Sequence, residues 1–148
     1  MGLLNLIMKP SKKEQNEISQ NIFWAQSYYD FIKSSCGVES FIDNKKRLLS
    51  ALIVLVNYET KYPRYFNHPK PTENHAKVQS ELPAIEKNYV DYYMSHIANK
   101  LLKYSTTRGK TNNFNKEVES FRRFGADFLP GTMEYFERQL EIHFNQYL

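Results

Sequence analysis

The sequence predicts an all-α protein, a compact antiparallel bundle of five or six helices around one buried central helix. The run Leu48–Val56 is apolar on every side of a helix, so a helix there must be covered on every side. It is too short to span a bilayer, which takes about 20 apolar residues. We therefore place the central helix at about residues 40–60. No stretch shows the alternation typical of a strand, and 148 residues suffice for a single domain over 1–148.

A capping box and an apolar stripe predict the first helix. Ser11 and Glu14 have the spacing at which each side chain caps the other residue's backbone amide. Apolar residues then recur at spacings of four and three, and the helix should end at Gly37. The stripe consists of Ile18, Ile22, Ala25, Tyr29 and Ile32. Residues 1–9 are expected to form a short strap over one end of the core.

Prolines in the middle of the chain indicate where its helices end or bend. A polar loop over 63–71 should follow the central helix, and Thr72 is a suitable cap for the next helix. Pro83 has no amide hydrogen, so we expect it to break or kink that helix near Leu82. A long helix is then predicted over about residues 84–104.

The C-terminal part is predicted to contain two more helices. Residues 105–113 are rich in Ser, Thr and Asn, so we expect a connecting loop there. A short helix should follow and stop at Gly125, and the last helix should start near Thr132. The apolar faces of these two helices comprise Phe114, Val118, Phe121 and Phe124, then Met133, Phe136, Leu140, Phe144 and Tyr147.

The composition of the chain excludes few classes of function. The net charge is +4 and the pI about 9.0, which permits an acidic or nucleic-acid partner without requiring one. A single cysteine, Cys36, excludes an internal disulfide and fits a reducing, cytoplasmic compartment. The N-terminus lacks the basic region and cleavage site of a signal peptide, and we expect no membrane association.

Motifs for cofactors and metals are absent from the sequence. It has no glycine-rich phosphate loop, no His-Glu-x-x-His and no paired cysteines, so no cofactor is predicted. His68 and His75 flank Glu73, but no helix geometry forces the three side chains onto one ion, and no metal is predicted. His96 lies among tyrosines, where a hydrogen-bonded structural role is the better interpretation than that of a base.

Arg138 and His143 on the last predicted helix form an Arg-x4-His pattern. This pattern resembles the Arg-x4–6-His signature of the HEPN ribonucleases, which are helical bundles of similar size. The resemblance implies metal-independent RNA cleavage at a site that two protomers share. It would make His143 the general acid or base and Arg138 the residue that stabilises phosphate charge. A HEPN-like nuclease is therefore one alternative function.

Binding of nucleic acid is a second alternative. Cations surround the polar stretch 105–113, with Tyr104 and Phe114 between them, and such a combination suits phosphate contact and base stacking. The candidate residues are Lys100, Lys103, Arg108, Lys110 and Lys116.

Binding of a protein partner is the leading prediction, with enzymatic activity less favoured. The chain has more aromatic residues than one bundle core readily absorbs, and Tyr and Trp are enriched at interfaces. Phe23, Trp24, Tyr28 and Phe31 lie off the main stripe of the first helix. The predicted partner-binding residues are Tyr62, Arg64, Tyr65 and Phe66. Such a protein would act as an inhibitor, an immunity-type protein, an assembly subunit or an adaptor, and self-association into a homo-oligomer is left open.

Overall fold

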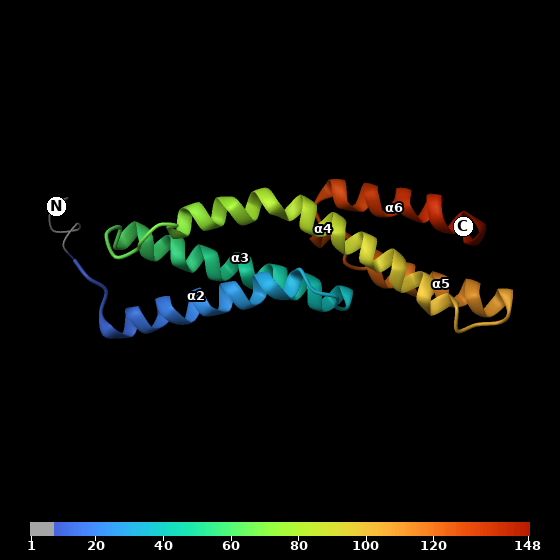
Figure 1. Cartoon of the computed structure of the whole chain (residues 1–148), viewed down its shortest axis with the longest axis horizontal. Coiled ribbons are helices and arrows are strands. Elements are labelled where there is room, and N and C mark those ends of the chain that lie inside the picture. The colour runs from blue at the N-terminus through green and yellow to red at the C-terminus, as the bar shows by residue number, and fades with distance from the viewer. Residues whose placement is uncertain (1–7) are drawn as a thin grey trace. The chain divides into compact units, whose positions relative to one another are not determined.

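The computed structural model describes residues 8–148, and in this range the protein is an all-α helical bundle (Figure 1). The predicted fold class is therefore confirmed. Two short 3-10 helices, Gly125–Asp127 and Asn145–Tyr147, accompany the α-helices. The α-helices are α2 (Lys12–Ile32), α3 (Val38–Lys61), α4 (Pro71–Leu101), α5 (Thr107–Arg122) and α6 (Pro130–Phe144).

The capping box at the start of α2 is confirmed. The Ser11 amide donates to Glu14 Oε1 at 2.9 Å, and the Glu14 amide donates to Ser11 Oγ at 3.2 Å. Three residues of the predicted stripe, Ile18, Ala25 and Ile32, are buried. Because they recur every seven residues, α2 packs along one narrow line and leaves both flanks of that line open to other contacts.

Helix α3 contains the apolar run, but it is not buried on every side. Leu48, Leu52 and Leu55 are buried, whereas Ile53 is 50% exposed. Ile53 lies one residue from Leu52, so it points about 100° away from the buried stripe. The expectation of a fully covered central helix is thus wrong on this face.

Pro83 does not break the helix in which it lies. Helix α4 is continuous from Pro71 to Leu101, with Pro83 inside it. Pro83 and Gln79, whose carbonyl loses its usual donor, are both exposed, so water can satisfy that carbonyl. Of the predicted break or kink near Leu82, the break is therefore wrong, because proline removes one hydrogen bond while packing holds the helix on either side.

The predicted loop over 105–113 is largely helical. Helix α5 starts at Thr107, because Thr106 Oγ1 accepts the Gly109 amide hydrogen at 3.0 Å and caps the first turn. A Cβ at Gly109 would lie 2.9 Å from Thr106 Oγ1, so a larger residue there would displace the capping hydroxyl. The polar composition of this stretch does not indicate a helix, because the buried side chains of α5, Asn113 among them, begin only about two turns after Thr107.

The chain divides into two compact units. Unit 1 comprises Met1–Ser34 and Asp43–Glu81, and unit 2 comprises Ser35–Ile42 and Leu82–Leu148. Helices α3 and α4 contribute residues to both units. The single domain over residues 1–148 stays a prediction. Most of the predicted strap, residues 1–7, lies outside the described residues, and the rest of it, Met8 and Lys9, is exposed.

Tyrosine–carboxylate hydrogen bonds join the helices of unit 1. Tyr58 on α3 donates to Glu17 on α2, and Tyr62, just after α3, donates to Glu14 Oε1 at 2.7 Å. The Ser11 amide, followed by the Tyr62 hydroxyl, lowers the pKa of Glu14 to about 2. These contacts set the antiparallel register of α2 and α3, since the partner number falls on α3 as it rises on α2. Figure 1 shows the two helices side by side.

The Tyr58–Glu17 contact predicts a loss of stability at alkaline pH. The hydrogen bond to Glu17, followed by burial, raises the pKa of Tyr58 from 10.0 to about 12. A raised pKa in the folded chain means that this stabilisation is complete below pH 10 and disappears as the pH rises towards 12. Urea unfolding between pH 8 and 12 should show that loss, and Tyr58→Phe should lower stability at pH 8 while reducing its pH dependence. Tyr28→Phe is the control; a wild-type loss that Tyr58→Phe leaves unchanged would contradict the assignment.

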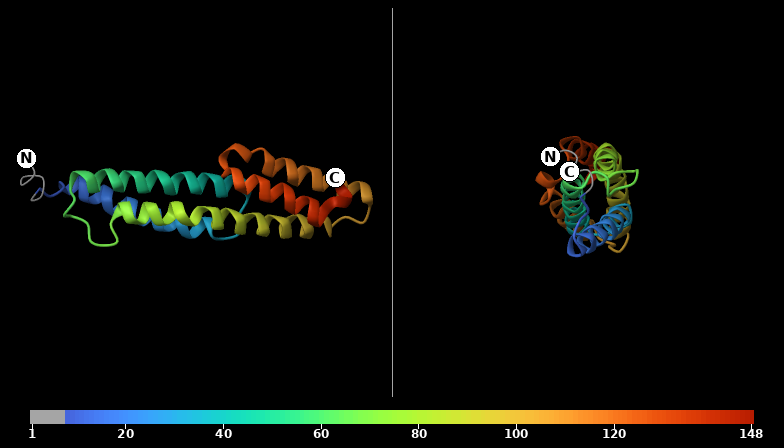
Figure 2. Two further views of the ribbon diagram at one scale, coloured as in Figure 1. Left: turned by 90° about the horizontal axis from the view of Figure 1, so that it is seen from above. Right: turned by 90° about the vertical axis from the view of Figure 1, so that its left-hand side faces the viewer.

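Unit 2 has an aromatic core. The Phe121 ring stacks on Phe136, with centroids 3.9 Å apart, and on Phe128 at 4.6 Å. Tyr93 on α4 approaches the same ring at 5.0 Å. Consecutive helices α4, α5 and α6 run antiparallel, as their contacts require, and Figure 2 shows the reversal at each connection.

A buried carboxylate fixes the start of α6. Glu86 on α4 is fully buried, and its Oε1 accepts the Leu129 amide hydrogen at 2.8 Å and the Thr132 hydroxyl at 2.6 Å. Leu129, the N-cap residue, has no side-chain cap of its own. Glu86 therefore supplies from α4 the cap that the local sequence of α6 lacks.

None of the described helices in residues 8–148 is long and apolar enough to cross a membrane.

Candidate functional site

Three helices of unit 1 surround an apolar groove. Helix α2 supplies one wall with Ile22, Gln26 and Tyr29, which are four and three residues apart and so lie on one face. Phe23 stands beside this row, and α4 forms the opposite wall. The lining residues are Ile22, Phe23, Ala25, Gln26 and Tyr29 of α2, Leu48, Leu52 and Leu55 of α3, and Asn74, Lys77 and Val78 of α4.

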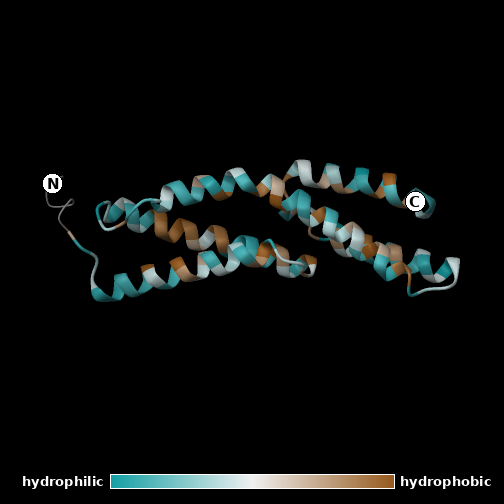
Figure 3. Ribbon diagram, in the orientation of Figure 1, coloured by the Kyte–Doolittle hydropathy of each residue, from teal (hydrophilic) through white to brown (hydrophobic). Residues whose placement is uncertain are grey.

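The floor of the groove is the apolar run of α3. Leu48, Leu52 and Leu55 recur at spacings of four and three and are buried. Figure 3 shows this part of α3 as one of the most hydrophobic stretches of the chain. The cavity above it measures about 320 Å³. The sequence thus places its most apolar segment beneath an opening and does not enclose it completely.

Two large apolar side chains stand at the mouth of the groove. Phe23 is 69% exposed and Ile22 is 52% exposed. Covering a side chain of this size stabilises by about 1.5–3 kcal/mol when burial is complete. Trp24 and Phe31, seven residues apart on the other flank of α2, are also exposed. Water-exposed apolar groups clustered at a concave surface are typical of a binding site.

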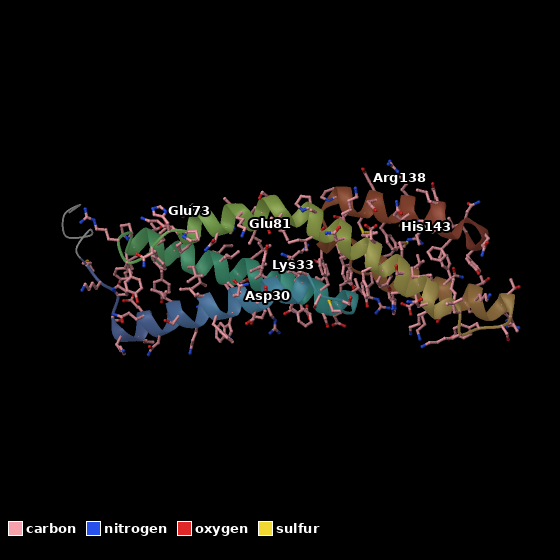
Figure 4. The ribbon with its side chains drawn as sticks, viewed as in Figure 1. Asp30, Lys33, Glu73, Glu81, Arg138 and His143 are labelled. Atoms are coloured by element: carbon pink, nitrogen blue, oxygen red, sulfur yellow. The ribbon has the colours of Figure 1, made fainter. Side chains whose placement is uncertain are left out.

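One end of the groove is polar and carries two cations. The Tyr29 hydroxyl donates to Glu81 across the groove. The Lys33 ammonium lies 4.6 Å from the centroid of the Tyr29 ring, and the Lys77 ammonium lies 6.0 Å from it. Lys77 Nζ is also 3.9 Å from Glu81 Oε1. Figure 4 labels Lys33 and Glu81 at this end.

The contact surface predicted on the loop after α3 is only partly available. Tyr62 is 3% exposed, and its hydroxyl is used by Glu14, so it serves the packing of unit 1 and is not accessible to a partner. Arg64 and Tyr65 are exposed, and Phe66 is partly exposed. The Tyr65 and Phe66 rings meet edge to face with centroids 5.5 Å apart. A reduced surface of Arg64, Tyr65 and Phe66 stays a prediction.

The predicted basic region lies on the end of α4 and on α5. Lys103, Arg108 and Lys116 are exposed and Lys110 is partly exposed, whereas Lys100 Nζ lies 3.7 Å from Glu117 Oε1. The aromatic residues proposed for base stacking differ in access, since Tyr104 is exposed and Phe114 is buried. Nucleic-acid binding stays a prediction, with Tyr104 as its accessible aromatic.

The Arg-x4-His pair lies on α6, where Figure 4 labels both residues. Arg138 lines a surface pocket of about 600 Å³ with Lys87 and Tyr135. His143 lines a different pocket, with Asp91 and Gln139, and its Nε2 is 3.0 Å from Gln139 Oε1. Gln139 belongs to both pockets, so the two are neighbours, but the structure does not place Arg138 and His143 in one cavity. The nuclease alternative stays a prediction.

The other histidines have structural neighbours. His96 Nε2 lies 3.2 Å from Glu117 Oε2, so the predicted hydrogen bond is present, and its structural role stays a prediction. His68 Nδ1 contacts Glu73 Oε1 at 2.6 Å, while His75 faces Gln79. Within residues 8–148, no three His, Cys, Asp or Glu side chains are arranged to hold a metal ion.

Sequence reasoning missed the groove as a site. Ile22 and Tyr29 were assigned to the core stripe of α2, and Leu48, Leu52 and Leu55 to a fully enclosed helix. The one available signal was the aromatic excess off that stripe, which included Phe23. Apolar spacing identifies the faces of each helix, but it does not show whether two neighbouring helices close over the third.

No protein-family model matches this chain, and no curated protein or solved structure is significantly similar to it.

Proposed function

We propose that the chain is a binding protein whose partner is another protein, and that the groove of unit 1 is its contact surface. The observation that carries this proposal is the exposure of Phe23 and Ile22 at the mouth of an apolar groove. A partner that covers them removes apolar surface from water, and aromatic residues at the edge of a pocket are typical anchors of protein interfaces. Inhibition, assembly or adaptor activity would each use such a surface.

The single cysteine, Cys36, supports a reducing compartment, and we propose a cytoplasmic location for this interaction. The loop residues Arg64, Tyr65 and Phe66 and the basic region would then be secondary surfaces. They carry charge and exposed aromatic rings, but they do not line the apolar groove. Self-association stays an alternative that the oligomeric state tests.

A negative charge placed at the mouth of the groove should strongly weaken partner binding. We expect the tagged protein, purified from its native cells, to retain a stoichiometric protein partner, and Phe23→Glu to lower the amount retained by at least about tenfold. The reason is that a carboxylate in place of Phe23 removes an anchor and must lose its water on binding. Mass spectrometry identifies the partner, and immunoblotting of it measures the loss.

Ile53→Glu is the matched control for that experiment. Ile53 is 50% exposed and lies in unit 1, but it does not line the groove, so its substitution should leave the partner bound. Circular dichroism should show that both variants stay folded, because neither residue is buried. A partner that Phe23→Glu retains would contradict the proposal. Nucleic acid in place of protein, released at high salt, would instead favour the basic region.

A further inference from the structure

We propose that the groove of unit 1 binds one amphipathic helix of the partner protein, with an acidic side chain of that helix facing Lys77 and Lys33. This inference rests on the proposed function and adds the chemistry of the partner. Three features of the groove carry it: its helical periodicity, the lack of a sheet edge, and the charge at its Tyr29 end.

The groove has the length and spacing of a helix-packing site. It follows α2 from Ile22 to Tyr29 and α3 from Leu48 to Leu55, which is two helical turns, or about 10 Å, in each case. The α3 leucines recur at spacings of four and three. Rows with this spacing form the ridges and grooves against which a second helix packs. A partner helix with leucines at the same spacings would fit between α2 and α4, against the leucines of α3.

A helix also satisfies its own backbone. The lining side chains come from three helices, whose amides are already paired within each helix. An extended peptide would find no edge strand to pair with and would lose water from unpaired amides. A helical segment avoids this loss, because its amide and carbonyl groups form hydrogen bonds with one another. The groove therefore selects a helical segment over an extended one.

The charge at the Tyr29 end selects an acidic group. Lys77 is the one charged residue among those that line the groove. Its neighbour Glu81 already accepts the Tyr29 hydroxyl, and Lys33 adds a second cation over the same ring. Lys33, Glu81 and Asp30 lie outside the lining, and Asp30 Oδ1 accepts from Gln26 Nε2 at 3.0 Å. Both carboxylates at this end thus already accept a hydrogen bond, and Lys77 is the charge that lines the groove, so a partner carboxylate would complement it.

The separation of the two ends also sets the direction of the bound helix. Ile22 and Phe23 mark the apolar end, and the cations lie near Tyr29, two turns further along α2. A helix with its acidic residue at one end of an apolar stripe would bind in one direction and register. Charged groups at the rim of an interface act mainly in this way, through orientation and partner choice.

Two synthetic peptides test the charge assignment on the full chain. Each has about 18 residues, long enough to be helical, with leucines at positions i, i+3, i+4 and i+7. One carries glutamate and the other lysine at the end of the stripe. Fluorescence anisotropy of the labelled peptides should show tighter binding of the acidic one. Phe23→Glu should weaken the binding of either peptide by at least about tenfold.

Charge reversal at Lys77 gives the decisive comparison. Lys77→Glu should weaken the acidic peptide by about fivefold and strengthen the lysine peptide, because exposed ion pairs contribute modestly and reversal exchanges attraction for repulsion. Lys12→Glu, ten residues before Ile22 on α2, is the control and should change neither affinity. Circular dichroism of each variant confirms that unit 1 stays folded.

Other outcomes overturn the inference in distinguishable ways. Equal affinity for the two peptides, or no binding of either, would refute the acidic helix, while a cellular partner lost on Phe23→Glu would still uphold the proposed function. Sedimentation that shows a wild-type dimer dissociated by Phe23→Glu would assign the groove to a second copy of the chain. A cellular partner retained by Phe23→Glu would remove the proposed function, and the inference with it.

Discussion

Phe121→Ala is expected to destabilise the protein by about 3–5 kcal/mol, the largest effect of any single substitution considered for its core. Phe121 is fully buried, and its ring lies between Phe136 at 3.9 Å and Phe128 at 4.6 Å, measured between ring centroids. Truncation removes the apolar area of the side chain and leaves a cavity between two stacked rings, which cannot both move inward without breaking other contacts. Urea unfolding followed by circular dichroism measures the loss.

Phe23→Ala provides the comparison within the same chain. It removes the same side chain from a position that is 69% exposed, so the change in unfolding free energy should stay within about 0.5 kcal/mol. The contrast separates the two roles of phenylalanine in this protein, one in the core of unit 2 and one at the groove of unit 1. A loss below about 1 kcal/mol for Phe121→Ala would mean that the aromatic stack adapts freely, against the close packing inferred here.

Local patterns predicted most of the fold. Ser11 and Glu14 located the start of α2, since a capping box is specified by two residues three apart and depends little on the rest of the chain. Two boundaries were predicted wrongly. Pro83 lies inside α4, where side-chain packing holds the helix on either side, whereas α5 starts within a polar stretch because Thr106 caps its first turn. Local propensity is a weak guide where such packing competes with it.

The candidate site was much harder to predict than the fold. Tyr62 and Phe23 are both aromatic residues, yet Tyr62 is buried against Glu14 and Phe23 is open to water. The difference depends on the contact of α2 with α3, which involves residues more than 40 positions apart. Periodicity predicts which side chains share a helix face, but the distance between α2 and α4, and hence the groove, is a tertiary property.

Tyrosine–carboxylate pairs account for part of the aromatic content of the chain, including Tyr62 of the predicted binding surface. Tyr29, Tyr58 and Tyr62 in unit 1 and Tyr93 and Tyr135 in unit 2 donate to carboxylates on neighbouring helices. Each places an apolar ring against the helix and a hydroxyl at its edge. These tyrosines therefore support helix packing, and the residues left for partner contact are the apolar ones that lack such partners, with Phe23 first among them.

Glu86→Ala is expected to destabilise unit 2 by about 3 kcal/mol, because a buried donor that loses its acceptor costs about 1–3 kcal/mol and two donors are affected. The substitution removes the acceptor for the Leu129 amide and the Thr132 hydroxyl at the start of α6. These donors then lie in a partly or fully buried environment without a carboxylate. Urea unfolding measures the loss, and amide exchange should be fastest in the first turn of α6.

Glu86→Gln tests whether one acceptor oxygen is enough to hold the start of α6. The amide keeps an acceptor oxygen for Leu129 and Thr132 but replaces the second carboxyl oxygen with an NH2 group, so we expect a smaller loss of about 1 kcal/mol. Thr132→Val should cost a similar amount, since it removes one donor and preserves the side-chain shape. If Glu86→Ala were as stable as the wild type, the cap on α6 would not depend on α4. In that event the positions of Arg138 and Gln139, which follow from the start of α6, would have to be set by the aromatic core around Phe136.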